Sequence, residues 1–337
     1  MRVLVTGGNG HLGFNLVQAL LGAGHRVRAS VRSLSDGPKT ARLSAGNVEI
    51  VQAELHRADE LRAAMEGIEV LFHAAAVYSY AEPERNAEML RASILGSELA
   101  LRAAADAGVR KVVFTSSIVT LPLTRPGAPP VDETQWTEDL RVPYLRAKVE
   151  GERVAWRLAR ERKVNMVSVL PGAMTGPGFV RNTPSLDLIE AMMKGAFRMG
   201  VPDMNCPLVD VRDVVTAHLL AAERDCEGRF AVCNDLLPSF EAMIRVMHEI
   251  DPRVALPLMR LPSLAAPFLL LAERLNQRLL GTPLTGSREL IATMKGRVFN
   301  ASNRRAKEVL GWAPAISMEQ TLRDTMDALR AREVRAA

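Results

Sequence analysis

Cysteine and aromatic residues are scarce in this chain, and both shortages limit the classes of protein it can belong to. The three cysteines, Cys206, Cys226 and Cys233, cannot all pair with one another and lack the spacing of metal ligands. Phe, Tyr and Trp together make up only 4% of the 337 residues, too few to alternate with basic side chains in a base-stacking platform. We therefore expect no disulfide framework, no metal site, no nucleic-acid partner and a reducing, cytoplasmic setting.

Long hydrophobic runs are lacking as well. The longest apolar stretch, residues 261–272, contains Pro262 and Pro267 and is shorter than the roughly 20 residues that a membrane-spanning helix needs. The first predicted strand starts at Arg2, which leaves no room for a signal peptide. The net charge of +5 is spread along the chain, and we interpret its denser groups, at 153–163 and 323–335, as solvated helix surfaces. We expect a soluble protein with no membrane span.

Residues 1–15 contain the motif around which the rest of the chain is interpreted. Residues 2–6 are typical of a short buried strand, glycines follow at 7, 8, 10 and 13, and a helical pattern begins near Leu12. Glycine allows a sharp turn and lets a pyrophosphate approach the helix N-terminus, whose free N–H groups and dipole favour an anion. The spacing Gly7-x-x-Gly10-x-x-Gly13 therefore predicts a phosphate cradle, although an ordinary glycine-rich turn would look similar.

Strands and helices alternate through the first half of the chain. Strands are predicted at 2–6, 25–31, 48–52, 70–76, 111–117 and 165–170, with helices at about 12–22, 57–66, 86–107 and 144–162. This alternation predicts an α/β fold, a Rossmann-type doubly wound parallel sheet. Helices are then predicted at 185–198, 211–222, 240–249 and 261–280, with a strand at 229–233. We assign 1–172 plus about 208–235 to a dinucleotide-binding domain, and about 173–207 and 236–337 to a smaller, discontinuous, mainly helical substrate-binding cap.

Arg32 follows the second predicted strand, where many NAD-binding proteins place an acidic residue that holds the adenosine ribose. A carboxylate there would repel a 2′-phosphate, whereas a guanidinium can bind it through two hydrogen bonds. Arg32, helped by Lys39, therefore favours NADP(H) over NAD(H). A solvent-facing arginine in a loop is the alternative.

Tyr144 and Lys148 stand four residues apart at the start of a predicted helix, so both side chains project from one face. Ser117 ends a neighbouring strand at the sheet edge where ligands bind. A nearby lysine cation lowers the pKa of a tyrosine from its ordinary value near 10, which suits the phenol to proton transfer. Ser117 could hydrogen-bond the same carbonyl oxygen, and Ser116 is the alternative hydroxyl.

These motifs together resemble the extended short-chain dehydrogenases/reductases, and in particular the dihydroflavonol-4-reductase-like and 3β-hydroxysteroid-dehydrogenase-like reductases. The resemblance rests on residues 6–13, 31–32, 114–117, 132–136, Tyr144 with Lys148, 171–177, 208–214 and 306–314. It implies NADP(H), reduction of a ketone or aldehyde, and a homodimer formed through helices 86–107 and 144–162. Lys148 would also hold the nicotinamide ribose.

The resemblance also implies a set of site residues. The catalytic group would be Ser117, Tyr144 and Lys148. The cofactor-binding residues would be Gly7, Gly10, His11, Leu12, Gly13, Arg32, Lys39, Glu54, Leu55, Ala74, Ala75, Ala76, Tyr144, Lys148, Pro171 and Gly172. Two positions depart from the family pattern: Glu54 replaces the usual aspartate beside the adenine, and Ser93 stands where an asparagine often precedes the glycine at 96.

Two other functions share this motif set. Nucleotide-sugar epimerases and dehydratases typically carry Tyr-Gly after the catalytic hydroxyl and Arg and Asn before the Gly-Pro at 176–177, and this chain has neither. A non-catalytic NADP(H)-binding protein would usually lack Tyr144 or Lys148. Apolar residues of the predicted cap favour a small apolar or cyclic substrate, although core packing explains many of them: Met192, Met193, Phe197, Met199, Met204, Leu264, Phe268, Leu269 and Leu271.

Overall fold

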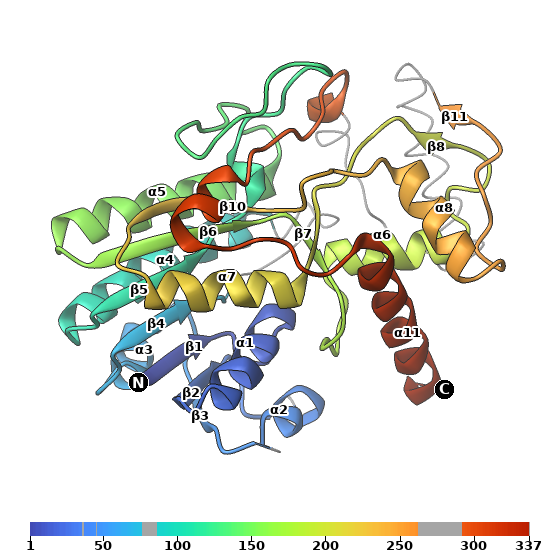
Figure 1. Ribbon diagram of the computed structural model, residues 1–337. Helices are drawn as coiled ribbons and strands as arrows, with labels where there is room; N and C mark the ends of the chain where they lie inside the picture. The colour runs from blue at the N-terminus through green and yellow to red at the C-terminus, as the bar shows by residue number, and fades with distance from the viewer. Residues whose placement is uncertain (36, 45, 76–85, 262–291, 337) are drawn as a thin grey trace.

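A computed structural model describes residues 1–35, 37–44, 46–75, 86–261 and 292–336 (Figure 1). Within these residues, seven parallel strands form one sheet in the order β10-β6-β5-β4-β1-β2-β3. The strands are β1 (Arg2–Thr6), β2 (Arg26–Val31), β3 (Glu49–Gln52), β4 (Val70–His73), β5 (Lys111–Thr115), β6 (Asn165–Pro171) and β10 (Gly228–Val232). The prediction of a Rossmann-type parallel sheet is confirmed.

Helices cover both faces of the sheet. The side chains of β1, which point alternately to the two faces, contact the helices on each side. Val3 and Val5 share one hydrophobic core with α1 (His11–Gly22) and α7 (Val211–Glu223). Leu4 points to the other face, into a core with α3 (Ala58–Ala64), α4 (Asn86–Asp106) and α5 (Pro143–Glu161). Because the strands are buried on both faces, they are almost continuously apolar.

A second group of helices lies beyond one side of the sheet (Figure 1). It consists of α6 (Pro184–Met193), α8 (Phe240–Ile250) and α11 (Met318–Ala336), which share a separate core that includes Met192, Met243 and Met326. Met192 is therefore a core residue, whereas Met199 is 74% exposed. Two short parallel strand pairs occur in the same part of the chain. They are β7 (Ala173–Thr175) with β9 (Leu208–Asp210), and β8 (Val201–Pro202) with β11 (Arg260–Leu261).

Several element ends differ from the predicted ones. The helix predicted at 185–198 ends at Met193, because Gly195 takes a positive φ of 76°. The strand predicted at 111–117 ends at Thr115, and Ser117 is instead the N-cap of the short helix η2 (Ile118–Thr120). The helix α2 (Gly37–Ser44) was not predicted. The helix predicted at 261–280, with Leu264, Phe268, Leu269 and Leu271, lies outside the described residues.

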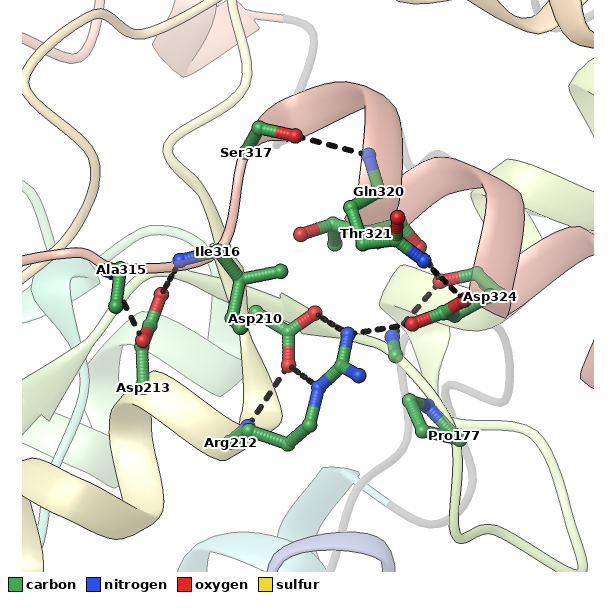
Figure 2. Close-up of polar contacts among 12 residues, drawn as sticks. Pro177, Asp210, Arg212, Asp213, Ala315, Ile316, Ser317, Gln320, Thr321 and Asp324 are labelled. Atoms are coloured by element: carbon green, nitrogen blue, oxygen red, sulfur yellow. Dashed lines mark hydrogen bonds and ion pairs between the residues drawn. The ribbon is translucent and has the colours of Figure 1, made fainter.

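Polar contacts attach α11 to the beginning of α7. Figure 2 shows the Arg212 guanidinium between two carboxylates, 2.8 Å from Asp210 and 2.7 Å from Asp324. The Asp213 carboxylate accepts the N–H groups of Ala315 and Ile316, both at 3.1 Å. Burial raises the pKa of Asp213. The C-terminal residues thereby become part of the structure around α7.

Two absences complete the description of the fold. None of the helices in the described part of the chain has the length and apolar character needed to cross a membrane. Cys206, Cys226 and Cys233 all lie in described ranges and are free thiols.

The turn between β1 and α1 leaves no space for a side chain at Gly13. A Cβ there would lie 2.1 Å from the Gly7 carbonyl oxygen. We predict that Gly13→Ala lowers the free energy of unfolding by about 2–3 kcal/mol, the size of other overpacking effects. Gly22→Ala, in the same helix with nothing within 4 Å of its Cβ, should be neutral or stabilising by up to roughly 1 kcal/mol. Urea unfolding of both variants measures this, and equal losses would contradict the packing argument.

Candidate active site

The glycine turn brings the N-terminus of α1 close to the ends of β1 and β4. Gly7 has a φ of +66°, and a Cβ on it would lie 2.9 Å from the Cα of Ala75. The Gly10 N–H donates to the Gly7 carbonyl at 2.9 Å, and Gly10 then caps α1 without a side-chain hydrogen bond. The first turn of α1 carries no acidic residue. A helix start with no side-chain cap and no acidic residue fits an anionic phosphate.

His11 and Leu12 occupy the first turn of α1. The His11 Nε2–H donates to the Pro177 carbonyl at 3.0 Å, and Asn15 donates to the same carbonyl at 3.2 Å. Burial lowers the pKa of His11 to about 4, so the imidazole is neutral at pH 7. The side chain of Leu12 is buried in the core beside the sheet, which leaves its backbone to meet a ligand.

The carboxyl end of β4 is held by a buried histidine that the sequence analysis did not identify. His73 Nδ1 lies 3.1 Å from Thr6 Oγ1, and Thr6 Oγ1 accepts the Ala75 N–H at 3.2 Å. The His73 ring stacks on Phe114 with centroids 5.3 Å apart. Burial, assisted by the Lys148 cation, lowers the pKa of His73 to about 4. Ala74 and Ala75 are half-buried beside it, and Ala76 lies outside the described residues.

Arg32 is exposed immediately after β2, at the same edge of the sheet as the glycine turn. The turn is tied to β2 because the Gly8 N–H donates to the Ser30 carbonyl at 3.0 Å. Lys39 falls within α2, and its side chain is not among those described. Arg32 and the glycine turn therefore lie at the same edge of the sheet.

Glu54 and Leu55 follow β3, and both have structural contacts. The Glu54 N–H donates to the Glu60 carboxylate at 2.9 Å, at the start of α3. Leu55 packs against α4, where a Cβ on Gly96 would lie 3.1 Å from the Leu55 Cβ. Ser93, on the same helix, donates to the Ala147 carbonyl at 2.9 Å. Ser93 therefore joins α4 to α5, the helix that carries Tyr144.

Tyr144, Lys148 and Ser117 lie on elements that pack around the carboxyl end of β5. Tyr144 is 5% exposed and belongs to a buried cluster that the η2 residue Val119 also contacts. The Lys148 ammonium lies 3.5 Å from the Thr115 carbonyl at the end of β5. Ser117 is the N-cap of η2 and is 7% exposed. The phenol, the ammonium and the hydroxyl therefore come from neighbouring elements at one sheet edge.

The two adjacent serines have different surroundings. Ser116 donates its hydroxyl hydrogen bond to Glu152 at 2.6 Å. The Ser117 hydroxyl instead accepts a long contact from the Val119 N–H at 3.4 Å. Glu152 and its partner Arg229 were missed by the sequence analysis. A charged residue within a segment that is otherwise buried could have identified both. Glu152, for example, lies on the same helix face as Lys148.

Pro171 and Gly172 mark the point where the chain leaves the sheet after β6. Pro171 is buried, and the Gly172 N–H donates to the Val232 carbonyl on β10 at 3.0 Å. A Cβ on Gly172 would lie 1.9 Å from the Pro207 carbonyl oxygen. This glycine is therefore required by packing, and both residues border the edge that holds Ser117.

The parallel sheet, the glycine turn and the buried tyrosine and lysine define an extended short-chain dehydrogenase/reductase. Residues 3–233 match the NAD dependent epimerase/dehydratase family, and the chain belongs to that family.

Two relatives and one solved structure indicate the range of its neighbours. Sterol demethylase protein B of Methylococcus capsulatus is 32% identical over 285 residues, covering 82% of this chain and 83% of the relative. Cinnamoyl-CoA reductase 1 of Petunia hybrida is 29% identical over 270 residues, covering 76% of this chain and 79% of the relative. The solved structure of the UDP-glucose 4-epimerase of Thermotoga maritima has a TM-score of 0.77 at 23% identity, covering 98% of this chain and 99% of that chain. This similarity shows a shared fold.

The buried histidines predict a loss of stability in mild acid. Burial lowers the pKa of His218 to about 4, as it does for His11 and His73. Between pH 6.5 and 4 the unfolded chain binds protons that the folded chain does not, so stability falls as the pH falls. At pH 5 each histidine should account for about 2 kcal/mol of this loss.

Urea unfolding between pH 7 and 5 measures the effect. His218→Gln should flatten the pH dependence by about one third, even if the variant is less stable at pH 7. The matched control is His56→Gln, at an exposed histidine, which should leave the slope unchanged. A slope that His218→Gln does not alter would contradict the assignment.

Proposed function

We propose that the protein is an NADP(H)-dependent carbonyl reductase that also runs in reverse as an alcohol dehydrogenase, acting on a small apolar or cyclic ketone or aldehyde. The observation that carries the proposal is the placement of buried Tyr144 and Lys148 on one face of α5, beside the end of β5. Membership of the NAD dependent epimerase/dehydratase family supports a nicotinamide cofactor. The reductase among its relatives supports carbonyl chemistry.

The residues of the chain would divide the chemistry among them. A bound nicotinamide supplies or accepts the hydride. Tyr144 donates its phenolic proton to the carbonyl oxygen, and the Lys148 ammonium stabilises the phenolate that is left. Ser117 donates a hydrogen bond to the same oxygen as negative charge develops there. Burial of all three side chains excludes water from the proton transfer.

The cofactor would lie along the carboxyl edge of the sheet, which ligands of open α/β sheets occupy. The glycines at 7, 10 and 13 would hold the pyrophosphate, and Arg32 with Lys39 the 2′-phosphate. Glu54 and Leu55 would border the adenine, and the alanines at 74–76 the ribose. Lys148, Pro171 and Gly172 would border the nicotinamide half. In this proposal residues 1–172 with 208–235 form the binding domain, and the rest forms the cap.

A nucleotide-sugar epimerase or dehydratase is the second candidate. It is supported by the likeness of fold to a UDP-glucose 4-epimerase over nearly the whole chain. Turnover of a UDP-sugar, without net consumption of NADPH, would favour it over the reductase. A non-catalytic NADP(H)-binding protein would bind the cofactor and turn over neither class of substrate. The cytoplasmic location and a homodimer through α4 and α5 remain predictions.

Replacing the proposed acid tests the mechanism. Tyr144→Phe should lower kcat for carbonyl reduction by two or more orders of magnitude, because it removes the proton that the carbonyl oxygen receives. The NADPH dissociation constant should change less than threefold, since the ring and its packing remain. NADPH oxidation in the presence of a carbonyl panel gives the rate, and fluorescence titration gives the affinity. Unchanged activity in the variant would rule out Tyr144 as the acid.

The cofactor preference can be tested at Arg32. Arg32→Glu should weaken NADPH binding by roughly tenfold to a hundredfold, because a carboxylate repels the 2′-phosphate, and should affect NADH much less. Arg26→Glu is the matched control, an exposed arginine at the opposite end of the same strand β2. Equal changes in both affinities at Arg32 would make it an ordinary surface residue.

A further inference from the structure

A fully buried carboxylate lies directly behind the proposed active site. Glu152 is 0% exposed and follows Lys148 by one helical turn and Tyr144 by two. Arg229 Nε donates to its Oε1 at 2.9 Å and Arg229 Nη2 to its Oε2 at 3.3 Å. The Ser116 hydroxyl donates to Oε2 at 2.6 Å, and Trp156 Nε1 lies 3.3 Å from Oε1. A buried carboxylate requires such partners.

Arg229 extends these contacts to two further segments. On β10 it is only 8% exposed, and its Nη1 donates to the Glu133 carbonyl at 2.7 Å and the Gln135 carbonyl at 3.0 Å. Its guanidinium carbon lies 3.6 Å from the centre of the Trp136 ring. Its Nη2 donates to the Thr120 hydroxyl at 2.6 Å.

Ser117 is held on both sides by this pair of charges. Before it, the Ser116 hydroxyl is bound to Glu152. After it, the Thr120 hydroxyl, which receives the Arg229 hydrogen bond, donates to the Ser117 carbonyl at 2.9 Å. The carboxylate therefore binds the residue before Ser117, and the guanidinium binds the hydroxyl that donates to the Ser117 carbonyl. The Ser117 hydroxyl itself is bound to neither charge and accepts the Val119 N–H at 3.4 Å.

We propose that Glu152 and Arg229 are positioning residues that fix the Ser117 hydroxyl relative to Tyr144 and Lys148. This inference rests on the proposed carbonyl reductase function. Because Tyr144, Lys148 and Glu152 are spaced by four residues on one helix, the carboxylate ties the end of β5 to the helix face that carries the acid. Stability alone does not explain the pair, because well-packed apolar residues can replace buried ion pairs without loss of stability.

Ser116→Ala tests the proposal with the least damage to the fold, since Glu152 keeps both of its bonds to Arg229. We expect kcat to fall by roughly tenfold to a hundredfold, as small misplacements of catalytic groups do. The NADPH dissociation constant, the melting temperature and the pH profile of kcat should stay close to those of the parent protein. Ser116→Thr, which keeps the hydroxyl, should restore kcat to within threefold.

A matched control and a second variant complete the test. Ser97→Ala removes another buried hydroxyl, which donates to the Ser93 carbonyl at 2.7 Å on α4, and should leave kcat unchanged. Thr120→Val removes the contact on the other side of Ser117 and should lower kcat as Ser116→Ala does. A kcat within twofold of the parent in both variants, or losses that parallel the melting temperature and that threonine does not restore, would overturn the proposal.

A structural measurement separates this proposal from the proposed function. Crystal structures of the parent protein and of Ser116→Ala should show that the Ser117 hydroxyl moves away from the Tyr144 phenol in the variant. An unmoved hydroxyl would overturn the positioning role whatever the activity. A parent protein that reduces no carbonyl compound would overturn the proposed function, and the displacement of Ser117 would still decide the role of Glu152 and Arg229.

Discussion

The close approach of α1 to the Gly7 carbonyl is the constraint on which the rest of the structure depends. It fixes the angle at which the first helix leaves the first strand, and it brings the end of β1 against Ala75 at the end of β4. β1 and β4 pair along their length, so their ends lie close together at the edge where ligands of such folds bind. A side chain in this turn would separate the helix from the sheet.

Several buried polar groups lie at the same edge of the sheet. They are either uncharged at pH 7 or joined in an ion pair. His11 and His73 lie at the glycine turn and at the end of β4, each uncharged at pH 7 because of burial. Lys148 points its ammonium to the carbonyl end of β5. Behind them, Glu152 and Arg229 neutralise each other. The proposed site therefore presents the Lys148 cation and the hydroxyl groups of Tyr144 and Ser117. None of these three residues carries a negative charge that would compete for the cation.

The sequence was sufficient for the sheet and for most of its helices, because periodic apolar residues and glycine turns act locally. Gly7, Gly10 and Gly13 indicated the cradle, and Tyr144 with Lys148 indicated one helix face, from spacing alone. Whether Ser116 or Ser117 is bound to a buried carboxylate could not be decided in this way. That choice depends on Glu152, which is distant in sequence and near only after α5 packs beside β5.

Other features depended equally on long-range packing. The role of Arg229 requires β10 to join the sheet beside β6, a pairing between segments about sixty residues apart. The contacts of Leu55 with Gly96, and of Ser93 with Ala147, likewise arise only when α4 lies between its neighbours. Local sequence patterns contain no information on contacts between distant segments. For this reason Glu152 and Arg229 were not identified from the sequence.

The attachment of α11 to α7 also has a consequence for the order of synthesis. Asp213 is separated by 103 residues from Ile316, whose N–H group it accepts. At ordinary rates of translation this stretch takes on the order of 5–20 s to be made. During that interval the sheet can assemble, but the Asp213 carboxylate has no backbone partner from the C-terminal segment. The nascent chain therefore holds an incomplete α7 end until Ala315 and Ile316 leave the ribosome.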